Sequence, residues 1–283
     1  MASPVGQNAA GVVLVGGRSS RMGTAKAALE WHGSTLLRRT LGVLARSIEG
    51  PLLVVRGPGQ LLPEIPPHVE VVDDPEPGRG PLQGIAAGLA ALAGRVHAAF
   101  VCSTDLPFLH PAFVCRVLTA LTTDLDVVLP VARGYPQPLA AAYRVTLAPL
   151  LAELLAAGEL RVTLLFRRCA TLHLDDAALL VDPALATADP ALESVVNVNT
   201  PDEYQAARQR LAPQVTVQTV TIDGRGGPHA VRAATLFGAA AAVGLGLPSR
   251  LVTTLNSSAI DSDGDIPLVT GDNIVFSCAD AGG

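Results

Sequence analysis

A glycine-rich loop that carries cations follows a short apolar run near the start of the chain. Residues 12–26 read V-V-L-V-G-G-R-S-S-R-M-G-T-A-K, and the loop brings together Gly16, Gly17, Arg21 and Lys26. Glycine lets main-chain N–H groups approach phosphate oxygens, hydroxyls donate further hydrogen bonds, and Arg and Lys offset the negative charge. The stretch therefore predicts a polyphosphate-binding loop after a strand, with an ordinary surface turn as the alternative.

Carboxylates follow two further apolar runs, where a phosphate-binding site would need them. Asp105 comes shortly after the run at residues 98–102, and Asp73 and Asp74 follow the run at residues 69–72. Ligands of open α/β sheets bind at the carboxyl ends of the strands, and Mg²⁺ takes carboxylate and phosphate oxygens as ligands. Asp105 is therefore the predicted Mg²⁺ ligand. Ordinary loop carboxylates are the alternative, above all for Asp73.

The elements that must position these residues alternate between apolar runs and helical patterns. Their order predicts an α/β fold, in which a parallel sheet has helices on both faces. Strands are expected at residues 12–15, 52–55, 69–72, 98–102 and 126–131, with an extended segment at 138–143. Helices are expected at residues 34–46, 85–93, 111–121, 147–157 and 161–168.

Several local features refine this scaffold. Ser34 is the expected N-cap of the first helix, the run at residues 69–72 is expected to be fully buried, and residues 75–84 should hold no regular structure. The stretch V-V-N-V-N-T-P at residues 195–201 predicts a strand that ends in a turn. Thr200 should then cap a helix over residues 202–211, with Pro201 at its first position. Residues 172–191 give no pattern that places an element.

The pattern changes near residue 213. Residues 215–222 alternate between apolar and polar side chains, which predicts a half-buried antiparallel strand and a domain boundary, giving domains at 1–212 and 213–283. The second domain should contain a helix at 231–243, strands at 251–255 and 273–278, and an extended tail ending in Gly282 and Gly283.

The composition excludes several classes of protein. Apolar residues make up 49% of the 283 residues, yet no apolar run approaches the roughly 18 residues of a membrane span. No signal-like segment opens the chain, so we expect a cytoplasmic protein that does not bind membranes. The net charge of −5 provides no general basic field for nucleic acid. Four cysteines without a C-x-x-C pair are expected to be reduced core residues.

The loop at residues 12–26 matches neither of two common phosphate-binding motifs. Lys26 is followed by Ala27 and not by Ser or Thr, and the spacing G-x-G-x-x-G is missing, which disfavours a P-loop ATPase and a dehydrogenase. The run L-V-G-G-R-S-S-R-M-G-x-x-K instead resembles the signature of nucleotidylyltransferases, specifically of molybdenum cofactor guanylyltransferases (MobA-like). Three further stretches agree in order, namely G-P-L-Q-G at residues 80–84, C-S-T-D-L-P at 102–107 and V-N-V-N-T-P at 196–201.

This resemblance implies a Rossmann-like nucleotidyltransferase sheet and a reaction between two small molecules. In the family, the terminal phosphate of a molybdopterin acceptor attacks the α-phosphorus of GTP and releases pyrophosphate. By resemblance, Mg²⁺ is bound by Asp105, and Arg21 and Lys26 stabilise charge on the triphosphate. The implied nucleotide-binding residues are Leu14, Val15, Gly16, Gly17, Lys26, Asp74 and Asp105, and the implied acceptor-binding residues are Asn197 and Asn199.

The match departs from the family at two positions. Ala25 stands where the family usually has Asp, and Arg56 stands where related enzymes often have a polar residue such as Asn. The pair Gly16-Gly17 is similar to the guanylyl branch, because the cytidylyl branch tends to carry Ala-Gly there. Transfer of CMP, or transfer to another phosphorylated acceptor, is the alternative.

The last quarter of the chain resembles β-grasp (ubiquitin-like, α+β) sulfur carriers of the MoaD and ThiS type. The matching stretches are L-N-S-S-A-I at residues 255–260, I-P-L-V-T-G-D at 266–272, N-I-V-F-S at 273–277, and the final Gly282-Gly283. The resemblance implies a terminal thiocarboxylate, an E1-like activating enzyme and the large subunit of molybdopterin synthase as partners. Two alternatives are a structural appendage and a chain that acts chiefly as a sulfur carrier and interaction protein.

Overall fold

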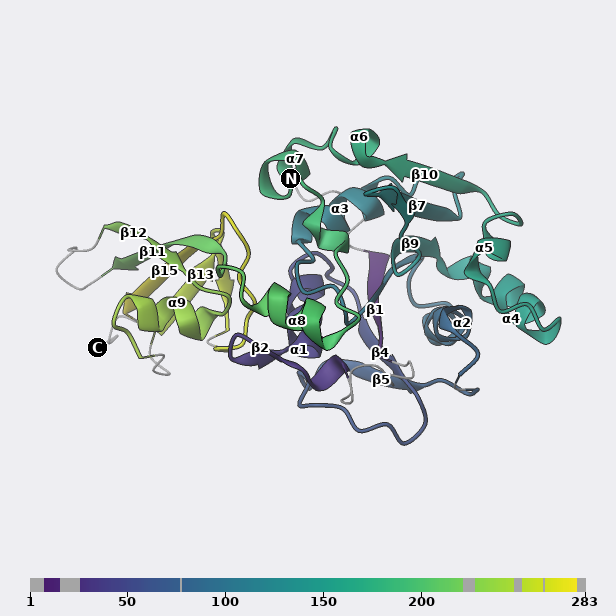
Figure 1. Ribbon diagram of the computed structural model, residues 1–283, viewed down its shortest axis with the longest axis horizontal. Helices are drawn as coiled ribbons and strands as arrows, with labels where there is room; N and C mark the ends of the chain where they lie inside the picture. Colours follow the sequence, from purple (N-terminus) through teal and green to yellow (C-terminus); the bar gives the residue numbers. More distant parts are fainter. Residues whose placement is uncertain are drawn as a thin grey trace. The chain divides into compact units, whose positions relative to one another are not determined.

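A computed structural model describes residues 8–15, 26–76, 78–220, 227–246, 251–261 and 263–278 (Figure 1). Contacts divide the chain into two units. The first unit comprises the residues up to Leu29 and Thr35–Tyr204, and the second comprises Glu30–Ser34 and the residues from Gln205 on. The division falls inside helix α8 (Pro201–Arg208).

The first unit is built on a mixed sheet whose central strands are buried apolar runs. The path of the sheet is β10-β7-β9-β6-β1-β4-β5, and β8 pairs with β7 at the side. Strand β9 runs antiparallel to both of its neighbours, so the expectation of a purely parallel sheet was wrong. The strands are β1 (Ala9–Leu14), β4 (Leu52–Arg56), β5 (Glu70–Asp73), β6 (Ala98–Ser103), β7 (Val127–Ala132), β8 (Tyr135–Pro136), β9 (Ala140–Arg144) and β10 (Thr171–Asp175).

Helices cover both faces of this sheet, as the sequence predicts. Helices α1 (Leu36–Ala45) and α3 (Pro111–Thr119) lie on one side, and α2 (Pro81–Ala91) and α4 (Ala148–Ala156) lie on the other (Figure 1). Side chains of a strand alternate between its faces, so β1 contributes Val13 to one apolar cluster and Val12 to the other. The two clusters bury the sheet and hold its carboxyl edge in place.

Shorter elements connect these layers. A two-stranded sheet pairs β2 (Glu30–Trp31) with β3 (Ser34–Thr35), and α5 (Val162–Leu165) confirms the short helix expected there. The unassigned residues 172–191 form part of β10 and two short helices, α6 (Asp176–Leu179) and α7 (Pro183–Ala188). Their caps are readable, because Asp175 accepts a hydrogen bond from Ala178 N and Asp182 accepts one from Leu185 N. The 3-10 turns are η2 (Lys26–Ala28), η3 (Val145–Leu147) and η4 (Glu193–Val195).

Four local expectations for the first unit were wrong. Thr35, not Ser34, caps α1 by accepting a hydrogen bond from Arg38 N at 3.2 Å, because Ser34 is used in β3. Helix α2 begins at Pro81, inside the segment expected to be irregular, since proline suits the first turn of a helix. Strand β5 is at the edge of the sheet and is largely exposed, and residues 196–199 form no strand.

The described residues of the second unit include a five-stranded sheet in the order β12-β11-β15-β13-β14 and helix α9 (Leu236–Ala242). Its strands are β11 (Gln214–Val220), β12 (Pro228–Arg232), β13 (Leu251–Leu255), β14 (Ser258–Ile260) and β15 (Asn273–Cys278). The expected antiparallel strand is confirmed where β11 pairs with β12, but the expectation was wrong on the other side of β11, which is parallel to β15. The helix also begins later than expected, because Val231 and Arg232 belong to β12.

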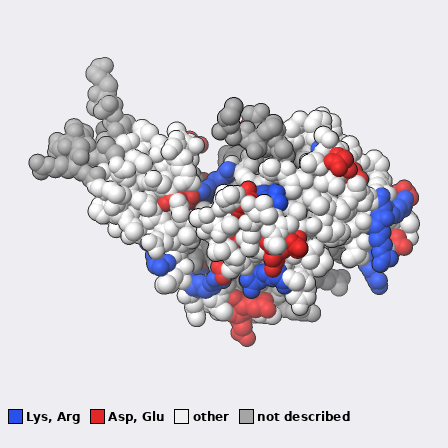
Figure 2. Space-filling view, turned by 90° about the horizontal axis from the view of Figure 1, so that it is seen from above, with Lys and Arg blue, Asp and Glu red and all other residues white. Residues whose placement is uncertain are grey.

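On the face in Figure 2, blue and red side chains lie in small neighbouring groups among mostly white residues. Cys102 is buried as expected, but Cys115 is exposed, so not all cysteines are core residues. In the part of the chain that the structure describes, no helix has both the length and the apolar character to cross a membrane.

Candidate active site

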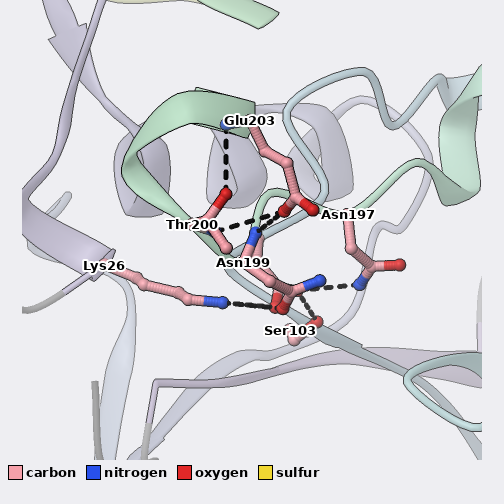
Figure 3. A network of polar contacts seen from close by, with 7 residues as sticks. Lys26, Ser103, Asn197, Asn199, Thr200 and Glu203 are labelled. Atoms are coloured by element: carbon pink, nitrogen blue, oxygen red, sulfur yellow. Dashed lines mark hydrogen bonds and ion pairs between the residues drawn. The ribbon is translucent and has the colours of Figure 1, made fainter. Parts of the chain in front are cut away.

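A polar cluster surrounds Asp105, just beyond the carboxyl end of β6. Asp105 Oδ2 accepts a hydrogen bond from Lys26 Nζ at 3.1 Å, and the two side chains are only 16% and 20% exposed. Asp105 Oδ1 accepts hydrogen bonds from Asn197 Nδ2 at 3.2 Å and from Ser103 Oγ. The sequence-predicted residues Lys26, Asp105, Asn197 and Asn199 therefore come together. Figure 3 shows the labelled side chains of Lys26, Asn197 and Asn199 close to one another.

Lys26 links two parts of the cluster. Lys26 is the first residue of η2, and its Nζ also donates a hydrogen bond to Asn199 Oδ1 at 3.0 Å. These residues are far apart in the sequence, so the tertiary fold is what brings the ammonium group to both oxygens. The cluster thus contains one carboxylate, one ammonium and two amides, a set suited to a ligand that carries both phosphate and metal.

A buried arginine holds the turn that carries Asp105. Arg39 of α1 is 6% exposed, and its Nε donates to the main-chain oxygen of Pro107 at 2.6 Å. From the other side, Val198 N donates to the main-chain oxygen of Asp105 at 3.0 Å. The main chain at Asp105 is therefore fixed independently of any ligand.

The two asparagines are positioned by the N-terminus of α8. Glu203 Oε2 accepts hydrogen bonds from the main-chain N–H groups of Asn199 at 2.6 Å and Thr200 at 3.1 Å. Thr200 Oγ1 in turn accepts from Glu203 N at 3.2 Å, which confirms Thr200 as the cap (Figure 3). This reciprocal pair is a capping box, which satisfies main-chain donors at the helix start and fixes the entry of the chain.

The cluster fits a divalent cation that is shared with a substrate. In the described residues no group of three or more His, Cys, Asp and Glu side chains could hold a metal by itself. Mg²⁺ is commonly bound by one or two carboxylates together with phosphate oxygens and water. Asp105 supplies one carboxylate at the sheet edge, with amide oxygens nearby, so the residues present fit such an ion.

Other predicted residues lie outside this cluster. Leu14 ends β1 and Val15 follows it; Val15 N donates to Val55 O at 2.9 Å, and Gln60 Nε2 donates to Val15 O at 3.1 Å. Asp74 Oδ1 accepts from Glu76 N at 3.0 Å. Its neighbour Asp73 pairs with Arg56 Nε at 2.8 Å. The predicted Gly16, Gly17, Arg21, Gly282 and Gly283 lie outside the described residues.

Sequence reasoning missed three residues that support the cluster, namely Ser103, Arg39 and Glu203. Glu203 had a readable signal, since Thr200 and Glu203 have the T-x-x-E spacing of a capping box. Cys102, which precedes Ser103, is fully buried. Burial, with a contribution from the Asp105 charge, raises the pKa of the Cys102 thiol far above its usual range.

Comparison with known proteins places this geometry in context. Residues 11–173 match the family described as the MobA-like NTP transferase domain. A probable molybdenum cofactor guanylyltransferase of Mycobacterium tuberculosis strain H37Rv is 42% identical over 160 residues, covering 55% of this chain and 78% of the relative. A protein of the same name from Mycobacterium avium is 35% identical over 207 residues, covering 72% of this chain and 96% of the relative.

Solved structures support the fold. The chain is similar to the molybdopterin-guanine dinucleotide biosynthesis protein A of Archaeoglobus fulgidus, with a TM-score of 0.54 and 24% identity, over 71% of this chain and 97% of that one. It is also similar to Rv0371c of Mycobacterium tuberculosis H37Rv, with a TM-score of 0.51 and 21% identity, over 72% and 100% of the two chains. At these identities the likeness concerns the α/β fold alone.

Proposed function

Since the chain belongs to the MobA-like NTP transferase family and is a nucleotidyltransferase, we propose that it transfers GMP from GTP to molybdenum-molybdopterin. The observation that carries the proposal is the cluster of Lys26, Asp105, Asn197 and Asn199 at the carboxyl edge of the sheet. The proposed nucleotide and acceptor follow the names of the relatives, which are probable molybdenum cofactor guanylyltransferases. Pyrophosphate and a dinucleotide are the products.

The reaction is a nucleotidyl transfer in which positioning and charge stabilisation do most of the catalysis. An oxygen of the acceptor's terminal phosphate forms a bond to the α-phosphorus of GTP. The bond from that phosphorus to the pyrophosphate oxygen breaks, and pyrophosphate leaves with the electron pair. Lys26 and the predicted Arg21 stabilise the charge on the triphosphate, and the predicted acceptor residues Asn197 and Asn199 orient the acceptor.

A divalent cation, for which we propose Mg²⁺, would be held by Asp105 together with phosphate oxygens and water. Such an ion neutralises charge that builds up on the transferring and leaving phosphates. Lys26 occupies Asp105 Oδ2 in the structure described here, so its ammonium group must turn toward the triphosphate when the substrate and the ion bind. Asp105 would then bind the ion instead of Lys26, and Lys26 would bind the triphosphate instead of Asp105.

The nucleotide is proposed to bind beside β1, along the main chain of Leu14, Val15, Gly16 and Gly17, with Asp74 at the same edge. Guanine is favoured over cytosine because the sequence carries Gly16-Gly17 and because the curated relatives bear guanylyltransferase names. Transfer of CMP, or transfer to a different phosphorylated acceptor, is the competing possibility.

The experiment that tests this function is a nucleotide-by-acceptor assay. GTP and CTP are each combined with Mg²⁺ and with molybdenum-molybdopterin, and both released pyrophosphate and the mass of the product are measured. We expect pyrophosphate release that depends on the acceptor, is fastest with GTP, and gives a product carrying GMP. Faster turnover with CTP would reassign the nucleotide, and no acceptor-dependent release would reject the function.

A sulfur-carrier role is proposed for the last quarter of the chain, with the boundary near residue 213. It is supported by the strand order β12-β11-β15-β13-β14 with its parallel pair β11 and β15, which suits a β-grasp domain with α9 packed on the sheet. The proposed partners are an E1-like activating enzyme and the large subunit of molybdopterin synthase. The carrier would bear its sulfur on Gly283.

Intact-mass analysis tests the carrier role directly. The full chain is incubated with an activating enzyme, ATP and a sulfur source, and the mass should rise by the difference between one sulfur and one oxygen atom. A variant without Gly282 and Gly283 is the control. An unchanged mass of the full chain would reject this role and leave the transferase proposal intact.

A further inference from the structure

A groove of about 500 Å³ lies beside the polar cluster on the first unit. It is lined by Arg133, Tyr135, Pro136, Gln137, Val195 and Asn197. Asn197 is shared with the cluster, because its Nδ2 donates to Asp105 Oδ1 at 3.2 Å. A volume of this size is within the range of small-molecule sites, and Asn197 connects the groove to the carboxylate proposed to bind the cation.

The order of the strands separates this groove from the proposed nucleotide site. Strand β6, which leads to Asp105, has β1 and β4 on one side and β9 and β7 on the other. The residues proposed for the nucleotide, Leu14, Val15 and Asp74, lie on the β1 side. The groove belongs to the β7 side, which is where the second substrate of the transfer would approach.

The rim of the groove is a tight hairpin between β7 and β8. Ala132 pairs with Tyr135, and the two residues between them, Arg133 and Gly134, have left-handed φ values of 54° and 82°. Two residues of this conformation make a hairpin turn that matches the twist of the strands. Gln137 Nε2 donates to the main-chain oxygen of Tyr135 at 3.2 Å, which braces the hairpin.

The hairpin carries an aromatic ring and a fixed cation toward the groove. Tyr135 is 72% exposed, so its ring is available to stack on a flat ligand. Arg133 is held by its main-chain N–H, which donates to Asp176 Oδ1 at 2.8 Å, and by Nη1, which donates to Ala191 O at 2.9 Å. A planar guanidinium fixed in this way suits an anionic or carbonyl-bearing heterocycle.

We propose that this groove binds the heterocycle of the acceptor, a phosphorylated flat pterin-type ring system, with its phosphate directed toward Asp105. The ring stacks on Tyr135, Arg133 binds its polar edge, and Asn197 marks the end of the groove where transfer occurs. The assignment rests on the proposed function, and it places acceptor specificity on residues that the sequence motifs do not include.

The test measures ligand binding separately from turnover. A phosphorylated pterin is titrated into the full chain and followed by its own fluorescence, and Mg-GTP is titrated in a separate experiment. The variants are Tyr135→Ala and Tyr135→Phe, and Val181→Ala is the control because Val181 is similarly exposed, at 75%, but does not line the groove.

We expect Tyr135→Ala to weaken binding of the phosphorylated pterin by about five- to tenfold, while Tyr135→Phe, Val181→Ala and all Mg-GTP affinities stay near those of the native chain. Equal pterin binding by the native chain and Tyr135→Ala would overturn the inference, as would no pterin binding by the native chain. A loss of Mg-GTP binding in Tyr135→Ala would also overturn it, by making the groove a nucleotide site. Failure of the proposed function is recognised separately, by the absence of pyrophosphate release.

Discussion

Lys26 and Asp105 form an ion pair that is partly shielded from water at the proposed site of transfer. A cation and an ammonium group cannot both sit on the same carboxylate oxygen without repulsion. With the proposed cation site at Asp105, Lys26 would have two opposing effects: it would weaken binding of a cation to the free enzyme and stabilise the triphosphate once the nucleotide is bound. The two effects can be separated by measurement.

Replacing Lys26 with methionine should raise the affinity for a divalent cation and lower turnover. In the absence of nucleotide, we expect Mn²⁺ titration to show about two- to fivefold tighter binding, because removing the partner of a partly exposed ion pair changes its energy only modestly. Turnover should fall by about two orders of magnitude, because a donor to the transition state is lost.

Arg56→Met is the matched control for this prediction. It removes one positive charge and one ion pair, that with Asp73 at 2.8 Å, outside the cluster. An equal rise in Mn²⁺ affinity in both variants would mean that the loss of one positive charge alone explains the effect. Unchanged Mn²⁺ affinity in Lys26→Met would show that Lys26 does not compete for Asp105.

At the scale of elements, the start of α8 determines where Asn197 and Asn199 lie. Glu203 binds the main chain of Asn199 and Thr200, and the asparagine side chains then reach Asp105 and Lys26. Glu203 is a positioning residue, because its carboxylate acts through the turn and not on a substrate. Its removal should therefore affect the geometry of the site more than the stability of the fold.

Glu203→Ala should lower kcat by about one to two orders of magnitude, because small displacements of positioning groups are costly. The free energy of unfolding should fall by only about 0.5–2 kcal/mol, the usual value of a lost cap. Glu203→Gln keeps an acceptor oxygen and should restore most of the activity. Asp202→Ala, which removes the neighbouring first-turn acid, is the control, and an equal loss of kcat there would refute the role of Glu203.

The contact between α2 and β1 depends on a glycine. A Cβ atom added at Gly88 would lie 2.7 Å from Val12 Cγ1, inside the buried core. Gly88→Ala gains about 1 kcal/mol in helix propensity but costs about 1–3 kcal/mol through overpacking. We expect the melting temperature to fall by a few degrees.

In the double variant Gly88→Ala with Val12→Ala, the smaller side chain at position 12 leaves room for the added methyl group. The change in the free energy of unfolding should therefore differ from the sum of the changes in the two single variants. Gly238→Ala in α9 is the control, since the nearest atom to its added Cβ is 3.4 Å away. Purely additive changes in the free energy of unfolding at positions 12 and 88 would contradict this packing.

The sequence predicted those parts of the fold that depend on local patterns. Strands β1, β4, β6 and β7 are buried apolar runs, and Thr200 with Pro201 correctly marked the start of α8. The extended segment expected at residues 138–143 is largely β9, but its antiparallel direction could not be recognised, because a strand buried on both faces has the same pattern whichever way it runs. The exposure of β5 follows from its place at the edge, which only the topology decides.

The sequence motifs also predicted part of the candidate site. The motifs identified Lys26, Asp105, Asn197 and Asn199, and the structure brings these residues together. Arg39 was missed because an arginine in an amphipathic helix has no sequence mark that distinguishes a buried, turn-holding side chain from an exposed one. The hairpin with Arg133 and Tyr135 was missed because its proximity to Asn197 is a tertiary relation.

At the scale of the whole molecule, the two units each have their own sheet and apolar core. All described residues of the polar cluster and the groove belong to the first unit. A chain cut after residue 212 keeps helix α8 complete, including its ion pair between Arg208 and Glu30. Nucleotidyl transfer should therefore not require the last quarter of the chain.

Residues 1–212 expressed alone should show the kcat and the two KM values of the full chain. Steady-state pyrophosphate release with GTP and the acceptor is the measurement, and circular dichroism of the shortened chain checks that it folds. A large loss of kcat in a folded 1–212 chain would show that the two units are catalytically coupled.

Asp105 is proposed to bind the cation that activates nucleotidyl transfer. The most direct test of this proposal is acceptor-dependent pyrophosphate release by Asp105→Asn, with Asp73→Asn as the control because Asp73 also lies at the carboxyl edge of the sheet but is paired with Arg56. We expect Asp105→Asn to lose at least about two orders of magnitude in kcat/KM, with its fold intact, and Asp73→Asn to remain active. Undiminished pyrophosphate release by Asp105→Asn would contradict the proposal.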